Sequence, residues 1–228
     1  GASVSTAGDV DGDGLDDILI GAVGNSDGAN WAGKTYLVLG KSLGSSSTID
    51  LATADYAFVG EGASDYSGHD VSTAGDVDGD GLDDILISAH YNDEGGTHAG
   101  KVYLILASSL GSSSTIDLSA ADYSFVGESG SDFSGISIST AGDVNGDGLD
   151  DILIGAVGNS DGGTNAGKTY LILGASLSSS STIDLATADY SFIGETSGDA
   201  SGHSVSTAGD VDGDGLSDIL IGAYGNDD

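Results

Sequence analysis

Residues 9–17, Asp9-Val10-Asp11-Gly12-Asp13-Gly14-Leu15-Asp16-Asp17, decide the fold of this chain, because the same stretch returns at a fixed spacing. Further copies, nearly letter for letter, begin at Asp76, Asp143 and Asp210, each 67 residues after the one before. A strict period of this length indicates one supersecondary unit that is stacked repeatedly on itself. The 228 residues hold about three and a half such units.

Each unit is expected to form four short strands joined by turns. In the first unit these are residues 3–7, 17–23, 34–39 and 56–59, and the chain's 40 glycines punctuate nearly every connection. No stretch has the apolar spacing of an amphipathic helix. The second and third strands are continuously apolar, which predicts sheets covered on both faces, and the small side chains of the first strand suit a crowded propeller axis. We predict an all-β fold of four-stranded antiparallel β-propeller blades.

The units are expected to divide the chain into residues 1–67, 68–134 and 135–201, with a partial unit of two strands and an acidic loop at 202–228. The chain opens and stops inside a unit, which predicts one repeat domain or a segment of a longer array. Because a closed propeller needs about four to eight blades, we expect an incomplete ring within this chain. Further blades, another copy or an open stack would complete or replace it.

The acidic loop has the composition of a calcium site. Asp9, Asp11 and Asp13 alternate, Asp17 closes the loop at its ninth position, and Leu15 offers its carbonyl oxygen. Ca²⁺ takes about six to eight oxygen ligands, which this spacing supplies with one water or one bidentate contact. An EF-hand is excluded, because the twelfth loop position is the apolar Ile20 instead of an acid.

The same register predicts one structural calcium ion per unit, about four in all. The predicted ligands are Asp9, Asp11, Asp13, Leu15 and Asp17; Asp76, Asp78, Asp80, Leu82 and Asp84; Asp143, Asn145, Asp147, Leu149 and Asp151; and Asp210, Asp212, Asp214, Leu216 and Asp218. Asn145 keeps an oxygen but removes a charge, so the third site is expected to be weaker. The neighbouring Asp16, Asp83 and Asp150 are expected to face solvent, because the fourth unit has Ser217 there.

The charge of the chain restricts its partners and its location. With 37 acidic and 4 basic residues, the formal charge of −33 argues against nucleic acid and anionic membranes as partners. There is no cysteine, so calcium is the expected substitute for disulfides, and calcium at the necessary concentration of about 10⁻⁴ to 10⁻³ M is found outside cells. We therefore expect a secreted or cell-surface protein without membrane insertion.

The units resemble FG-GAP repeats, the blades of the β-propeller in integrin α subunits and in bacterial secreted repeat adhesins. The resemblance covers the whole chain and rests on the acidic loop, on residues 17–22, and on the aromatic-Ser-Gly sequences at residues 66–68 and 133–135. It implies a calcium ion in the hairpin between the first two strands of each blade. The fourth unit departs from the pattern with Ala200-Ser201-Gly202, and the family's Gly-Ala-Pro signature lacks its proline here.

Several other motifs are weaker. Residues 28–35 and 162–169 match the phosphate-loop pattern, but a strand follows instead of the required helix, so we reject both. Three carboxylate pairs recur in the units and are expected to be cation sites or solvated turns: Glu61/Asp65, Glu128/Asp132 and Glu195/Asp199. A catalytic role is not expected, because an active site places its two carboxyls in different environments, whereas these pairs are copied from unit to unit. Lys34, Lys101 and Lys168 are expected to pair with carboxylates. The serine tracts before residues 48, 115 and 182 are expected to be flexible surface loops.

These features favour a non-enzymatic, extracellular calcium-binding repeat module for adhesion or recognition of a protein or a polysaccharide. In the loop between the second and third strands, an exposed Trp31 offers a surface on which a sugar can stack. One alternative is a structural array in which copies associate end to end into a fibre or surface layer. Another is a propeller that targets a secreted polysaccharide-degrading enzyme.

Overall fold

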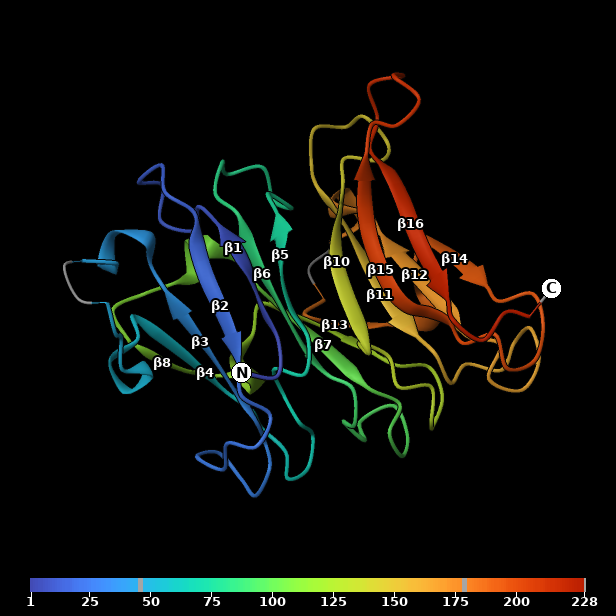
Figure 1. The fold of residues 1–228 in the computed structure, drawn as a ribbon, viewed down its shortest axis with the longest axis horizontal. Coiled ribbons are helices and arrows are strands. Elements are labelled where there is room, and N and C mark those ends of the chain that lie inside the picture. Colours follow the sequence, from blue (N-terminus) through green and yellow to red (C-terminus); the bar gives the residue numbers. More distant parts are fainter. Residues whose placement is uncertain (45–46, 178–179, 228) are drawn as a thin grey trace.

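The computed structural model describes residues 1–44, 47–177 and 180–227, and its strands form four sheets (Figure 1). The first strands are β1 (Val4–Gly8), β5 (Val71–Gly75), β10 (Ser137–Gly142) and β15 (Ser201–Gly209). The second strands are β2 (Asp17–Gly21), β6 (Asp84–Ala89), β11 (Asp151–Ala156) and β16 (Asp218–Ala223). The third are β3 (Lys34–Val38), β7 (Lys101–Ile105) and β12 (Lys168–Ile172), and the fourth are β4 (Tyr56–Val59), β9 (Tyr123–Val126) and β14 (Tyr190–Ile193). We call the sheet of each unit a blade.

The predicted all-β class and the antiparallel order of the strands are confirmed. In the first blade Leu19 of β2 lies between Ser5 of β1 and Leu37 of β3, and β3 pairs with β4. Helical turns in the described residues are single 3₁₀ turns. They are η1 (Gly40–Ser42), η2 (Leu51–Thr53), η3 (Ala107–Ser109), η4 (Leu118–Ala120), η5 (Gly174–Ser176) and η6 (Leu185–Thr187). No helix in the described part of the chain is both long and apolar enough to cross a membrane.

Two blades have a fifth strand that the sequence did not predict. The segment β8 (Thr115–Asp117) of the second unit pairs in parallel with β4 of the first blade, and β13 (Thr182–Asp184) pairs with β9 in the same way. Leu118 and Leu185, which follow these strands, are buried. These segments follow the serine tracts for which a flexible loop is predicted, and serines 45–46 and 178–179 of those tracts lie outside the described residues.

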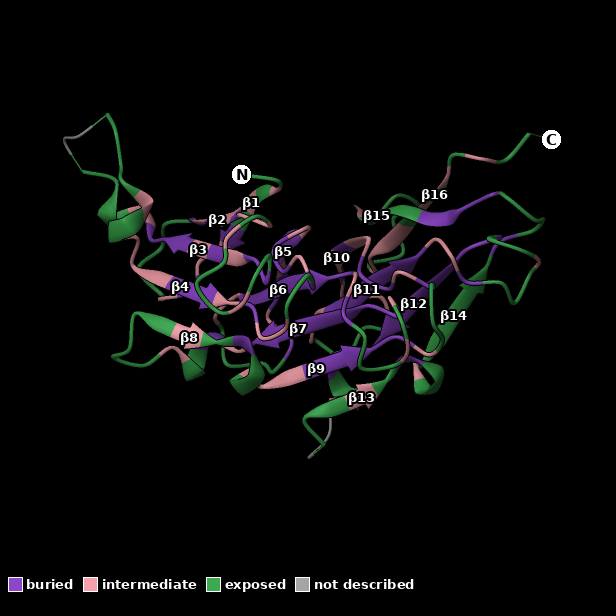
Figure 2. Ribbon diagram, turned by 90° about the horizontal axis from the view of Figure 1, so that it is seen from below, coloured by how far each residue is buried: buried purple, intermediate pink, exposed green. Residues whose placement is uncertain are grey.

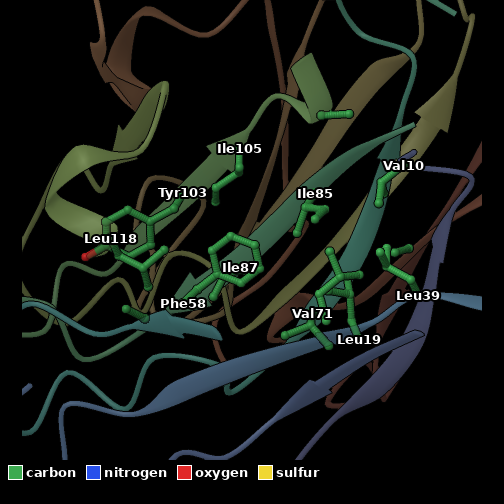
Figure 3. Close-up of a cluster of buried hydrophobic side chains, with 14 residues drawn as sticks. Val10, Leu19, Leu39, Phe58, Val71, Ile85, Ile87, Tyr103, Ile105 and Leu118 are labelled. Carbon is green, nitrogen blue, oxygen red and sulfur yellow. The ribbon is translucent and has the colours of Figure 1, made fainter. Parts of the chain in front are cut away.

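The hydrophobic core lies between neighbouring blades. Figure 3 shows Leu19, Leu39 and Phe58 of the first blade in one cluster with Val71, Ile87 and Tyr103 of the second. A second cluster joins the second and third blades, and a smaller one joins the third blade to β15 and β16. All residues of β6 and β7 are buried, as continuously apolar strands require.

The blades form an open array, and their sheets do not close into a ring in the described structure. The first strands β1, β5, β10 and β15 follow one another along one side (Figure 1). Burial is greatest in the middle of the array and falls toward β14 and β16 (Figure 2). Tyr190 and Ile193 of β14 are exposed, and so are Val4 at the other end and Leu220 of β16.

Candidate metal centres

Each acidic loop wraps around the carboxylate of its first aspartate. In the first loop Oδ1 of Asp9 accepts hydrogen bonds from the N–H groups of Gly12 (2.8 Å) and Asp13 (3.1 Å), and Oδ2 accepts one from Gly14 (2.9 Å). Gly12 and Gly14 have φ values of 72° and 85°, in the left-handed region that glycine adopts readily. The loops that begin at Asp76, Asp143 and Asp210 repeat these bonds.

The last aspartate of each loop anchors it to the blade. Asp17 is buried, and its carboxylate accepts hydrogen bonds from the N–H groups of Val10 (3.0 Å) and Gly40 (2.7 Å). Burial raises the pKa of Asp17 and raises that of the equivalent Asp84 to about 7, although two backbone hydrogen bonds to each carboxylate oppose the shift. Ionising such a group without a nearby cation is costly, so a bound divalent ion would stabilise the charged form.

In three of the four loops the structure brings carboxylate oxygens within 4.8 Å of one another. The groups are Asp9, Asp11 and Asp13; Asp76, Asp78 and Asp84; and Asp210, Asp212 and Asp218. A cluster of carboxylate oxygens is the kind of donor set that Ca²⁺ prefers, so these loops fit that ion. The predicted leucine ligands lie in the same turns, where each leucine N–H is bonded to the aspartate two residues earlier.

The third loop differs from the others, as the sequence suggests. The side-chain amide of Asn145 donates a hydrogen bond to Oδ2 of Asp147 at 2.9 Å, and this loop shows no comparable group of three acids in the described structure. The first loop has a feature that sequence reasoning missed, because Lys41 forms an ion pair with Asp11. The second and third units have Ser108 and Ala175 in place of Lys41.

Neighbouring loops contact one another across the blade boundary. Oδ2 of Asp83 accepts a hydrogen bond from the N–H of Asp9 at 2.9 Å, and Asp150 does the same for Asp76 at 3.0 Å. The prediction that Asp83 and Asp150 face solvent is therefore wrong. Asp16 of the first unit is exposed. The contact could not be read from the loop sequence, because it depends on the neighbouring unit.

The carboxylate pairs at the opposite end of the blades are engaged in structural contacts. Glu128 accepts hydrogen bonds from Lys168 (2.7 Å), Tyr170 (2.8 Å) and Asn159 (2.8 Å), and Asn159 also bonds Asp132 (3.0 Å). Glu61 and Asp65 make the matching contacts with Lys101, Tyr103 and Asn92. The prediction that the lysines pair with carboxylates is confirmed, with Lys34 bonded to Asp27 at 2.9 Å. These acids tie one blade to the next rather than lying in solvated turns.

Known proteins share this repeat. The FG-GAP repeat profile matches residues 1–38, 67–105, 134–172 and 201–228, so it covers all four acidic loops. The chain is 29% identical to integrin alpha-PS2 of Drosophila melanogaster over 226 residues, and 31% identical to integrin alpha-PS5 of the same organism over 177 residues. It is also 29% identical to integrin alpha pat-2 of Caenorhabditis briggsae over 235 residues.

These matches cover most of this chain but a small part of each relative. They include 96% of the chain for alpha-PS2 and pat-2 and 75% for alpha-PS5, and the chain spans 15–17% of the length of these relatives. It is thus homologous to a repeat region of integrin α subunits. The repeated profile, the spacing of the loops and the blade structure agree, and the chain belongs to the FG-GAP repeat family.

Proposed function

We propose that this chain is an extracellular, calcium-binding β-propeller module for adhesion or recognition of a protein or polysaccharide. One Ca²⁺ ion would bind in each acidic loop, through the four side chains and one leucine carbonyl oxygen predicted above, and would make the loop rigid. The homology to integrin α subunits supports a role in adhesion or recognition. Calcium at the required concentration places this activity outside the cell.

The observation that carries the proposal is the clustering of carboxylates in loops that lack enough cations to balance them. In the second loop Asp76, Asp78 and Asp84 approach within 4.8 Å, and the described residues place no lysine against them. Such groups repel one another unless protons or a metal ion bind. Because Asp83 joins the second loop to the first, an ion in either loop would also hold the boundary between two blades.

The structure also supports a module without catalytic activity of its own. A pair of catalytic carboxyls needs two different environments, so that one is protonated while the other is ionised. Glu61/Asp65 and Glu128/Asp132 instead have the same partners in two successive units. Their partners are a lysine, a tyrosine and an asparagine of the next unit, so these contacts hold neighbouring units together.

Thermal unfolding with and without calcium tests the proposal. We expect 1 mM Ca²⁺ to raise the melting temperature above that in excess chelator, because each site adds about 1.4 kcal/mol when the ion is at ten times its Kd. Mg²⁺ at the same concentration is the control and should stabilise the chain less, since it demands a smaller octahedral site. Equal melting temperatures with calcium and with chelator would contradict the proposal.

A second candidate function, a structural array of copies joined end to end, is supported by matching surfaces at the two ends. Phe192 and Ile193 of β14 are exposed, whereas the equivalent Phe125 and Val126 of β9, which pairs with β13, are buried. At the other end Ile49 is 38% exposed and belongs to no sheet, although Thr-Ile-Asp-Leu at 48–51 repeats the sequence of β8 and η4. Analytical ultracentrifugation in calcium would show long polymers if this candidate is right and a discrete small species if it is wrong.

A further inference from the structure

The four units differ from one another mainly in the loops opposite the acidic ones, and several of these differences converge in space. His69 lies two residues before β5, and His90 and Tyr91 directly follow β6. The other units have different residues at most of these positions. Those residues are Ala2, Ile136 and His203 in place of His69; Val23, Val157 and Tyr224 in place of His90; and Gly24, Gly158 and Gly225 in place of Tyr91. The second unit therefore has a group of rings that no other unit reproduces in full.

These rings form a continuous aromatic surface with two residues of the first unit. Ring centroids are 5.7 Å apart for Trp31 and Tyr66, 5.3 Å for Tyr66 and Tyr91, 4.4 Å for Tyr91 and His90, and 3.8 Å for His90 and His69. Trp31 is 47% exposed. Trp31 and Tyr66 have φ values of 57° and 56°, a left-handed conformation that their equivalents in the other units share, so the backbone of the repeat sets the direction of both rings.

A pocket of about 270 Å³ opens on this surface and is lined by Val23, Tyr66, His69, His90 and Tyr91. His90 is 6% exposed, and the Nδ1 atoms of His69 and His90 have no hydrogen-bond partner within the described residues. Burial lowers the pKa of both imidazoles, that of His90 to about 3, so both are neutral at pH 7. A buried polar atom without a partner is unfavourable, so a hydroxyl group that reached one of these Nδ1 atoms would relieve that cost.

We propose that this pocket binds one neutral sugar ring of a polysaccharide, with the ring face against Tyr66 or Tyr91 and hydroxyl groups on His69 and His90. The inference rests on the proposed recognition function and names its ligand class and site. Aromatic rings provide the apolar contact for a sugar face, and a neutral imidazole both donates and accepts hydrogen bonds, as a hydroxyl group does. Trp31 extends the surface toward the next ring of the polymer.

The charge and size of the site favour a neutral sugar over other ligands. A chain with a formal charge of −33 repels acidic sugars and phosphates. A cationic side chain would gain a cation–π contact but no ion pair, because no carboxylate lines the pocket. The volume lies just below the range of about 300–1,000 Å³ that is usual for drug-sized ligands, which suits a single ring.

Saturation-transfer NMR in millimolar calcium tests the proposal on the full chain. The neutral probes are the methyl glycosides of glucose, galactose, mannose and N-acetylglucosamine, and Nα-acetyl-lysine N-methylamide is the cationic probe. The test variants are Tyr91→Gly and His90→Val, which introduce residues that the first and third units already have at those positions. His203→Ile is the matched control, because His203 forms a similar ring pair with Tyr224, at 4.6 Å, in the fourth unit.

We expect at least one neutral glycoside to bind the wild-type chain, and both test variants to weaken that binding about tenfold or more. The control variant should bind as the wild type does. The proposal is overturned if no neutral glycoside binds, if only the lysine probe binds, or if both test variants bind the glycoside unchanged. Because calcium-dependent melting is measured separately, loss of sugar binding alone would leave the proposed calcium module intact.

Discussion

The carboxylate of Asp83 accepts a hydrogen bond from the backbone N–H of Asp9 at 2.9 Å, although the two residues are 74 positions apart in the chain. The N–H of Asp83 in turn donates to the carbonyl oxygen of Asp9 at 3.2 Å. A side chain at Gly8 would collide with the Asp83 carboxylate, so the close approach of the two loops requires glycine there. Asp9 is a proposed ligand of the first calcium site, and Asp84 is a proposed ligand of the second. Asp83, which precedes Asp84, therefore joins the first proposed site to the second.

Replacing Asp83 with serine, the residue of the fourth unit, should therefore weaken both the blade boundary and the first calcium site. We expect a loss of about 1–2 kcal/mol in the free energy of unfolding, because a hydrogen bond to a charged acceptor disappears. Asp16→Ser is the matched control, since Asp16 has the same place in its loop but is exposed, and it should change stability by about 0.5 kcal/mol or less. Chemical denaturation in calcium measures both, and equal losses would exclude a special role for Asp83.

The third acidic loop should bind calcium more tightly after Asn145→Asp. The change adds a carboxylate and removes the amide hydrogen bond to Asp147, so the loop regains the charge of the other three. We expect calcium affinity at one site to rise about tenfold, because ligand charge sets the affinity of calcium loops. Asp78→Asn in the second loop is the reciprocal variant and should lower the affinity of one site. Isothermal titration calorimetry measures the calcium affinities of each variant, and a uniform change at all sites would contradict the prediction of a change at one site.

The strands could be predicted closely because local signals mark them. The expected strand at 56–59 agrees with β4, and the strand expected at 17–23 ends two residues earlier as β2, at Gly21. Glycine turns and apolar runs carry this information within a few residues. The strand β8 was missed because three residues, Thr-Ile-Asp, are too short to indicate a strand. The same letters at 48–50 form no strand in the structure, so the edge of the preceding blade decides their conformation.

Contacts between units limited what could be predicted of the site. The grouping of acids within a loop follows from their alternate spacing and from glycines that allow the turn. Asp16 and Asp83 have identical neighbours in sequence, yet only Asp83 has a loop of a preceding blade to bind. The ion pair between Lys41 and Asp11 likewise joins residues 30 positions apart, through a connection whose path depends on packing.

Glu128→Gln should destabilise the boundary between the second and third blades. Glu128 faces Lys168, whose side chain is 9% exposed, and glutamine would keep the shape of the contact while removing its charge. We expect a loss of about 2 kcal/mol, because a buried cation is left with Asp161 as its remaining acid partner. Glu195→Gln is the control at the same position of the third unit, where the glutamate is exposed. Scanning calorimetry would show a lower melting temperature for the first variant alone.

The buried His90 should make the fold sensitive to acid. Its pKa falls from the ordinary 6.5 to about 3, first because burial disfavours the charged imidazole and then because His69 and His98 lie nearby. The unfolded chain binds a proton at this residue below pH 6.5 and the folded chain does not. The stability that His90 contributes is therefore complete above pH 6.5 and is lost as the pH falls toward 3. Between pH 6.5 and pH 5 the loss should be about 2 kcal/mol.

His90→Val removes this titrating group and has a precedent in Val23 and Val157 of the neighbouring units. Between pH 7 and pH 5, in saturating calcium, the variant should lose about 2 kcal/mol less unfolding free energy than the wild type. His203→Ile, at an exposed histidine, is the control for replacing a histidine with an aliphatic residue elsewhere in the chain. Acid also protonates the carboxylates of the calcium loops, but that loss is common to all three proteins. An identical pH dependence in His90→Val and the wild type would show that His90 is accessible to protons in the folded chain.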